Sequence, residues 1–174
     1  CLEGFVPCER EVSIIAVRSR AGEGRFYPLV ENHHRGGILR LSFSPAPGIT
    51  RELQEEAELY ASKVLNHLEY VGVLAIEFFV KDGHLLANEM APRVHNSGHW
   101  TIEGAATSQF ENHLRAVARL PLGATAALGH SAMINIIGAF PELENVLPIY
   151  GVHFHDYRKV PRPGRKLAHL TVRS

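Results

Sequence analysis

The sequence has little cysteine and no excess of charge of either sign. Its 174 residues include two cysteines, Cys1 and Cys8, and 18 Lys and Arg residues balance 18 Asp and Glu residues. Two thiols near one end, without a Cys-x-x-Cys pair, do not make a disulfide framework and predict an intracellular protein. The zero net charge argues against a nonspecific nucleic-acid binder, which needs a positive field, and against a polybasic membrane anchor.

Long hydrophobic runs and a leader sequence are also lacking. The charge-free stretch at 123–141 contains His130, Asn135 and several glycines, which predicts a loop and a buried strand rather than a membrane span. No signal peptide is recognisable, and the sequence does not start with methionine. We expect a cytoplasmic protein, or a plastid protein if the source is a plant, that binds neither nucleic acid nor membranes.

Hydrophobic periodicity predicts a mixture of strands and helices in this chain. Strands are expected at 11–18, 25–30, 37–43, 72–80, 84–90, 131–137, 151–157 and 166–172. A helix is expected over 50–68, with Thr50 as its N-cap and an apolar stripe that includes Leu53, Ala57, Tyr60, Ala61, Val64, Leu65 and Leu68. Because strands and helices do not alternate strictly, the order predicts an α+β architecture.

A second helix is predicted after residue 107. Ser108 and Glu111 have the spacing of a capping box, which marks a helix start. Phe110, Leu114 and Val117 then fall on one face of the helix, which ends before 120–123 (LPLG).

Two glutamates flank a predicted hairpin turn. Glu77 lies within an apolar strand, Asp82-Gly83 is a turn signal, and Glu89 follows in the return strand. A two-residue turn places Glu77 opposite Asn88, whereas a three-residue turn places it opposite Glu89. Facing carboxylates repel each other unless a cation lies between them, and hard oxygen ligands suit Mg²⁺ held against phosphates. The alternative is that Glu77 simply faces solvent.

The segment 88–100 is unusually rich in polar functional groups. Arg93 offers a planar clamp for an anion, and His95 and His99 can serve as acid, base or donor. Each histidine alone is as well explained by a polar turn, but the whole cluster favours a functional site.

A basic, proline-stiffened segment lies at 158–166, and its fixed cations suit a phosphate or a carboxylate, although a solvated loop is the alternative. His33-His34 and His153-x-His155 are weaker candidates for metal ligands, because no third ligand occurs at a recognised spacing. Neither Gly-x-x-x-x-Gly-Lys nor Gly-x-Gly-x-x-Gly occurs, so a nucleotide would not be bound by those loops.

Three motifs together resemble one family. They are the run 88–101 (NEMAPRVHNSGHWT) followed by 109–111 (QFE), the run 26–29 (FYPL) with Asn32, His34 and 37–40 (GILR), and the run 162–166 (RPGRK). The chain is similar, over almost its whole length, to the ATP-dependent carboxyaminoimidazole ribonucleotide synthases of purine biosynthesis, which are ATP-grasp ligases. The resemblance implies an ATP-grasp C-terminal half, with an antiparallel or mixed sheet and flanking helices, plus a small β-rich subdomain.

The resemblance also implies a reaction, with ATP and Mg²⁺ as cofactors and aminoimidazole ribonucleotide and bicarbonate as substrates. ATP phosphorylates bicarbonate to carboxyphosphate, and this species, or the CO₂ that it releases, is captured by the amine of the ribonucleotide. The positions that match ATP contacts in the family are Glu3, Gly4, Phe5, Val6, Glu11, His34, Asn88 and Glu89.

Other positions match the family's metal and substrate sites. Glu77 and Glu89 match the Mg²⁺ carboxylates, which favours the three-residue turn. Arg93 and His95 match catalytic positions, where Arg93 offsets developing charge and His95 steers bicarbonate or a proton. Asn96, Arg165 and Lys166 match positions on the substrate side.

The family comparison suggests a domain division and leaves two alternatives. We expect a hinge and the end of a lid domain at 1–12, an ATP-grasp core at 13–122 and a β-rich subdomain at 123–174. The family's N-terminal substrate domain and most of its lid are not expected in this chain, so catalysis by the chain alone is not expected. A homodimer is expected. The alternatives are a non-catalytic module with the same fold and another ATP-grasp carboxylase, such as a biotin carboxylase.

Overall fold

The computed structural model describes residue 4 and residues 6–174. Glu3 and Phe5, which were expected to contact ATP, lie outside the described residues. The strands are β1 (Arg10–Arg18), β2 (Gly24–Phe26), β3 (Val30–Arg35), β4 (Ile38–Ser44), β5 (Gly72–Lys81), β6 (His84–Ala91), β7 (Ser131–Ile137), β8 (Val152–Asp156) and β9 (Lys166–Arg173). The helices are α1 (Arg51–His67), α2 (Thr101–Gly104), α3 (Gln109–Val117) and α4 (Leu143–Val146), with a short 3₁₀ helix at Asn96–Gly98.

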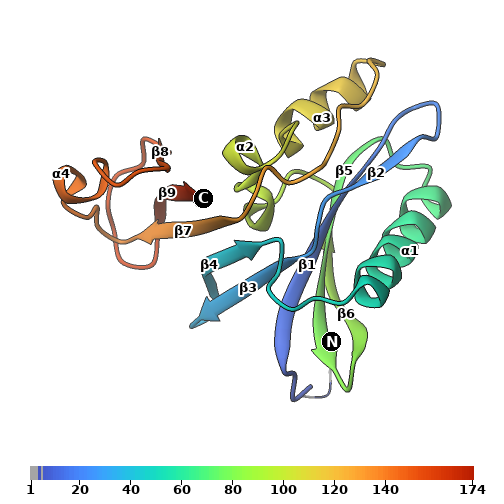
Figure 1. The fold of residues 1–174 in the computed structure, drawn as a ribbon, viewed down its shortest axis with the longest axis horizontal. Helices are drawn as coiled ribbons and strands as arrows, with labels where there is room; N and C mark the ends of the chain where they lie inside the picture. Colours follow the sequence, from blue (N-terminus) through green and yellow to red (C-terminus); the bar gives the residue numbers. More distant parts are fainter. Residues whose placement is uncertain (1–3, 5) are drawn as a thin grey trace.

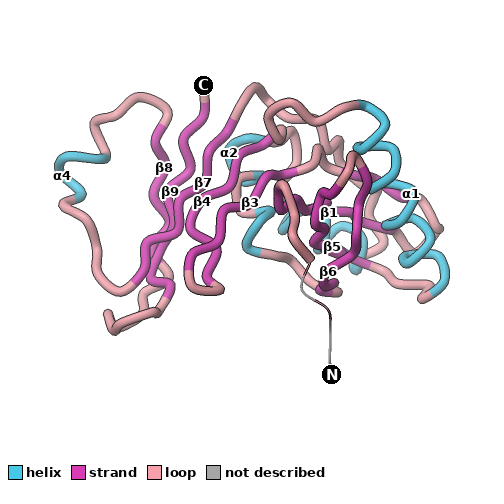
Figure 2. Tube along the Cα trace, turned by 90° about the horizontal axis from the view of Figure 1, so that it is seen from below, coloured by secondary structure: helices cyan, strands magenta, loops and turns pink. Residues whose placement is uncertain are grey.

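One large sheet organises the described part of the chain. Its strand order is β6-β5-β1-β3-β4-β7-β9-β8, and β2 pairs with β1 outside this order. All of these pairs are antiparallel. Figure 2 shows β8, β9, β7, β4 and β3 side by side, with α1 at the opposite end of the molecule. The predicted α+β class is confirmed.

Helices cover the sheet near β1 and β5 (Figure 1). The Thr50 side chain caps α1 by accepting a hydrogen bond from Leu53 N, as the sequence predicted. Ala57, Ala61 and Leu65 of α1 are buried in a core that includes β1 and β5 residues. A second core contains the fully buried Trp100 and residues of β5 and β7. None of the described helices is long and apolar enough to cross a membrane.

The strand expected at 25–30 is wrong in its bounds. The chain forms β2 at Gly24–Phe26 and then a separate strand, β3, at Val30–Arg35. In β3 a polar residue, Asn32, occupies a buried position where an alternating strand would have a hydrophobic side chain. Hydrogen bonds hold its amide there. Asn32 Nδ2 donates to Ser13 Oγ at 2.9 Å, and Ser42 Oγ donates to Asn32 Oδ1 at 2.9 Å.

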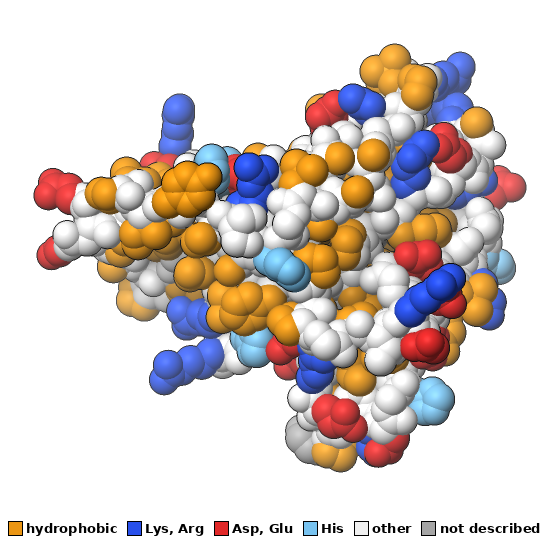
Figure 3. Space-filling view, viewed as in Figure 1, with side chains coloured by type: hydrophobic (Ala, Val, Ile, Leu, Met, Phe, Trp, Pro, Cys, Tyr) orange, Lys and Arg blue, Asp and Glu red, His pale blue; other side chains and the backbone are white. Residues whose placement is uncertain are grey.

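The predicted helix after Ser108 is α3, and the Ser108 side chain caps it by accepting a hydrogen bond from Glu111 N, but its apolar face is largely exposed. Leu114 is 67% exposed and Val117 is 51% exposed, and hydrophobic side chains reach the surface over this part of the molecule (Figure 3). The buried residues are instead Gln109, Asn112 and Ala116. Hydrogen bonds allow polar groups to be buried here, because an unpaired polar group would be costly.

Asn112 shows how the polar face is satisfied. Its Nδ2 donates to Tyr27 Oη at 2.8 Å, and its Oδ1 accepts from Gly123 N at 2.8 Å. Tyr27 Oη in turn donates to Thr107 O at 2.9 Å. The side chain therefore ties α3 to the connection between β2 and β3 and to the loop that leads into β7.

We predict that Asn112→Ala lowers the free energy of unfolding by about 2–3 kcal/mol, because it leaves buried partners without hydrogen bonds. The matched control is Leu114→Ala on the same helix, which should change it by less than about 0.5 kcal/mol because Leu114 is exposed. Urea unfolding of both variants measures the two values. A larger loss for Leu114→Ala than for Asn112→Ala would contradict this packing.

Candidate active site

The β5–β6 hairpin brings the two predicted carboxylates together. Lys81 pairs with His84, so the turn contains two residues, and both of them, Asp82 at φ 50° and Gly83 at φ 75°, have the positive φ of a type I′ turn. The three-residue turn favoured by the resemblance is therefore wrong. Glu77 nevertheless pairs with Glu89, because the register shifts between Glu77 and Phe78.

The register shift is a bulge in β6. Phe78 pairs with Ala87 and Glu77 with Glu89, so Asn88 is the additional residue. A bulge changes the face to which the side chains after it point, relative to the side chains before it. Here it turns Glu89 to the partner position of Glu77, which is the facing arrangement that the sequence argument considered.

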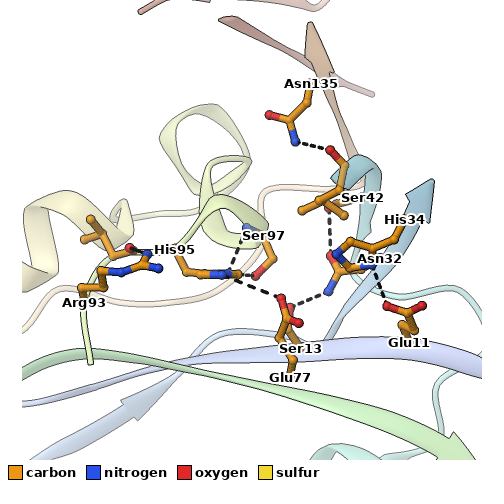
Figure 4. Close-up of polar contacts among 12 residues, drawn as sticks. Glu11, Ser13, Asn32, His34, Ser42, Glu77, Arg93, His95, Ser97 and Asn135 are labelled. Atoms are coloured by element: carbon orange, nitrogen blue, oxygen red, sulfur yellow. Dashed lines mark hydrogen bonds and ion pairs between the residues drawn. The ribbon is translucent and has the colours of Figure 1, made fainter. Parts of the chain in front are cut away.

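His95 completes the carboxylate cluster. Ligand atoms of Glu77, Glu89 and His95 all lie within 4.8 Å of one another, and His95 Nε2 is 3.7 Å from Glu77 Oε1 (Figure 4). The other ring nitrogen of His95, Nδ1, is 2.9 Å from Ser97 Oγ. The ring is therefore oriented from both of its nitrogens.

The backbone of His95 is fixed by α3. His95 N donates to Gln109 Oε1 at 3.0 Å, and Gln109 Nε2 donates to His95 O at 2.7 Å. Gly98 permits this approach, because a Cβ at that position would lie 2.6 Å from Gln109 Oε1. The buried amide of Gln109 thus holds the polar segment against the sheet.

Burial sets the protonation of the cluster. It raises the pKa of the Glu77 carboxyl, and the charges of Glu89 and Glu11 act in the same direction, while His34 and Lys166 oppose it. Burial also lowers the pKa of His95 to about 4, with Arg93 and Lys166 adding to the effect. At neutral pH the imidazole is uncharged, so it can accept or donate one hydrogen bond without adding a cation.

A cavity of about 470 Å³ opens next to this cluster. Its lining combines residues from β1, β3, β5, β6 and β9 and contains eight predicted site residues: Glu11, His34, Glu77, Asn88, Glu89, His95, Asn96 and Lys166. Within it, His34 Nδ1 lies 2.6 Å from Glu11 Oε2. A neighbouring hollow is lined by Gly4 and Val6 and shares Glu11 and Asn88 with the cavity.

A basic pocket lies on the other side of Lys166. Its lining is Arg93, Val94, Asn96, His99, Tyr157, Lys159 and Lys166. Asn96 and Lys166 line both hollows, so the basic pocket adjoins the carboxylate cavity. Both polar atoms of the Asn96 amide are buried without a partner among the described residues. Burial lowers the pKa of Lys166, and Lys159 and Arg93 add to this shift.

Two of the site residues predicted from the sequence, Arg93 and Arg165, do not line the carboxylate cavity. Arg93 lines the basic pocket but not the carboxylate cavity, and its Nη1 donates to Val94 O at 3.0 Å. Arg165 lines neither hollow, and its Nη1 donates to Val160 O at 3.4 Å. Sequence reasoning did not find Tyr157, whose only signal was its position beside the basic segment.

Comparison with known proteins agrees with the fold. Residues 1–110 match the ATP-grasp domain family, and residues 131–174 match the phosphoribosylaminoimidazole carboxylase C-terminal domain. The chain belongs to the ATP-grasp family. Its relatives include the N5-carboxyaminoimidazole ribonucleotide synthase of Pseudomonas aeruginosa, 60% identical over 99% of this chain and 47% of the relative. The Aquifex aeolicus enzyme of that name is 44% identical over 98% of this chain and 47% of the relative.

Solved structures show the same likeness. The N5-carboxyaminoimidazole ribonucleotide synthetase of Thermus thermophilus superposes with a TM-score of 0.98 at 64% identity, over 99% of this chain and 48% of that chain. The Aspergillus clavatus synthase in complex with ADP and 5-aminoimidazole ribonucleotide has a TM-score of 0.91 at 35% identity, over 98% of this chain and 48% of that chain. The present chain thus spans about half the length of the relatives that it matches.

A cluster of aromatic side chains forms the back of the basic pocket. The Tyr157 hydroxyl is 3.0 Å from His99 Nδ1 and 2.8 Å from His169 Nδ1. Burial lowers the pKa of His99 to about 4 and that of His169 to about 3, with neighbouring histidines adding to both shifts. It also raises the pKa of Tyr157 to about 12. These groups are therefore all neutral at pH 7.

We predict that acid destabilises the protein through this cluster. The unfolded chain binds protons at its histidines near pH 6.5, whereas folded His99 and His169 resist protonation down to about 4 and about 3. The contribution of these two neutral histidines to the free energy of unfolding is complete above pH 6.5 and is lost as the pH falls toward 4. His169→Asn, which keeps a polar nitrogen or oxygen in place of Nδ1, should reduce the loss of unfolding free energy between about pH 7.5 and about pH 5.

The measurement is urea unfolding at both pH values. The same replacement at His84, which is exposed at the start of β6, is the control for removing one histidine. An equal pH dependence in the original protein and in the His169→Asn variant would contradict the assignment.

Proposed function

We propose that this chain forms the ATP-grasp part of an enzyme that carboxylates the amine of 5-aminoimidazole ribonucleotide at the expense of ATP. Bicarbonate attacks the γ-phosphorus of ATP, which releases ADP and forms carboxyphosphate. The amine then takes up the carboxyl group, directly or as CO₂, and phosphate leaves. The observation that carries the proposal is the Glu77–Glu89–His95 cluster, which opens on a cavity that adjoins the basic pocket. The names of the relatives support the substrate.

The carboxylates of Glu77 and Glu89 would hold Mg²⁺. The donor set fits, because two facing carboxylates near a nucleotide cavity suit a hard cation. No Lys or Arg side chain forms an ion pair with either carboxylate among the described residues. When bound, Mg²⁺ supplies positive charge against the phosphate oxygens. We assign His95 to the substrate rather than to the metal, because Mg²⁺ prefers oxygen ligands.

The chain's own residues would divide the remaining work. The proposed nucleotide side comprises the carboxylate cavity and the neighbouring hollow. Its lining includes Gly4, Val6, Glu11, His34 and Asn88. On the other side, Asn96 and Lys166 would bind the anionic reactants. Arg93 would offset the charge on the transferred group, and neutral His95 would orient bicarbonate or move a proton at Nε2. Phosphoryl transfer depends mainly on such positioning and charge neutralisation.

The domain division and the oligomer remain predictions. We propose a hinge at 1–12, a core at 13–122 and a β-rich part at 123–174, which the β4–β7 pairing joins into one sheet. A homodimer is also proposed, and analytical ultracentrifugation of the chain tests it directly.

We predict that Glu89→Ala weakens binding of Mg·ATP at least about tenfold, because it removes a charged ligand from the carboxylate pair. Isothermal calorimetry on the chain measures the affinity. The matched control is Glu144→Ala in α4, an exposed glutamate far from the cavity in the chain, which should leave it unchanged. Equal affinities for all three proteins would contradict the proposed metal site.

The reaction is tested by phosphate release from Mg·ATP in the presence of bicarbonate. The full-length Pseudomonas aeruginosa relative serves as the positive control. Because catalysis by the chain alone is not expected, the N-terminal half of that relative is joined to this chain. In this completed enzyme we expect release to increase with aminoimidazole ribonucleotide and to fall in His95→Asn, because the neutral ring nitrogen facing Glu77 is lost. Release from the completed enzyme that ignores the ribonucleotide, or a chain that does not bind ATP, would contradict the proposal.

A further inference from the structure

A connected set of side chains lies behind the basic pocket and is not used in the reaction described above. Oε1 of Glu103 in α2 lies 2.6 Å from Nε2 of His155 in β8. The His155 ring stacks on the His169 ring of β9, with centroids 4.5 Å apart and planes at 12°. His169 then meets the Tyr157 hydroxyl, which also meets His99. The set thus runs from α2 through β8 and β9 to the pocket wall.

The Tyr157 hydroxyl determines which protons these rings carry. It has one hydrogen, and it lies within hydrogen-bond distance of two Nδ1 atoms. It can therefore donate to one ring and must accept from the other. One histidine then carries its proton on Nδ1, and the other carries it on Nε2.

The environment of His169 selects between the two arrangements. Its Nε2 is buried without a partner among the described residues. A buried N–H without a partner is rarer and costlier than a buried nitrogen lone pair. His169 therefore carries its proton on Nδ1 and donates to Tyr157, and Tyr157 donates to His99 Nδ1. This leaves His99 with its proton on Nε2.

The His99 ring is also held in place by packing. It lies 5.5 Å from the Phe110 ring, 6.1 Å from the Tyr157 ring and 4.8 Å from the His169 ring, measured between centroids. Because Nδ1 is taken by Tyr157, Nε2 is the ring nitrogen left for the pocket that His99 lines with Arg93 and Lys166.

We propose that Tyr157 and His169 are positioning residues that hold His99 as the Nε2–H tautomer, so that His99 donates a hydrogen bond to an oxyanion in the basic pocket. The inference rests on the proposed function for the identity of that oxyanion, which is a phosphate of the ribonucleotide or the bicarbonate. Burial keeps His99 neutral at pH 7. It therefore adds a directional donor beside Arg93 and Lys166 without further cation repulsion.

The tautomers can be read without any nucleotide or turnover. Long-range ¹H–¹⁵N spectra of the histidine-labelled chain report which ring nitrogen carries the proton, and a His99→Gln spectrum assigns the His99 signal. We expect His99 as Nε2–H and His169 as Nδ1–H. Tyr157→Phe should abolish the single tautomer of His99, whereas Tyr150→Phe, at a residue that is 93% exposed, should change nothing. His99 carrying its proton on Nδ1 would overturn the proposal.

Ligand probes then test the donor role in the same spectra. Aminoimidazole ribonucleotide, inorganic phosphate and bicarbonate are added separately. A His99 Nε2 shift with ribonucleotide and phosphate assigns the donor to the phosphate group, and a shift with bicarbonate alone assigns it to the carboxyl-bearing reactant. Tyr157→Phe should weaken the responding probe about fivefold, the effect of one hydrogen bond. No shift with any probe would overturn the donor role. Calorimetry with Mg·ATP reports separately on the proposed function.

Discussion

The site depends on the bulge at Asn88 in the edge strand β6. Side chains alternate along a strand, so a register slip of one residue exchanges the two faces of the sheet. Without the additional residue, Asn88 would face Glu77 and the second carboxylate would point to the other face. One backbone irregularity therefore creates the carboxylate pair, and His34 and Lys166, which line the same cavity, oppose the negative charge that gathers around Glu77.

The sequence predicted these carboxylates through chemistry rather than through correct geometry. Asp82-Gly83 identified the turn, but the local pattern could not reveal a bulge five residues later, and the turn length was inferred wrongly to explain a facing pair that does exist. The buried polar face of α3 could not be predicted from the sequence for a related reason. Its apolar stripe was visible in the sequence, but the burial of Asn112 depends on Tyr27 and Gly123, which are distant along the chain.

The basic pocket shows the same limit more clearly. Tyr157 contacts His99 across 58 positions of sequence, and the antiparallel β8–β9 pairing brings His155 opposite His169. No local periodicity contains such information, because it arises only when segments that are separate along the chain meet in the fold. Residues with a distinctive local motif, such as His95 and Lys166, were found, whereas Tyr157 was visible only after the pairing was known.

The carboxylate cavity and the basic pocket differ in the sign of the charged residues that line them. Glu77 and Glu89 line the carboxylate cavity, which is the proposed nucleotide side, and Arg93 and Lys159 line the basic pocket, which is the proposed side for anionic reactants. Lys166 lines both hollows, next to neutral His95 in the first and neutral His99 in the second. Keeping both imidazoles uncharged limits repulsion with the cations, so the pocket can hold several donors for one anion. The polarity of the site therefore follows from burial as much as from the charged residues themselves.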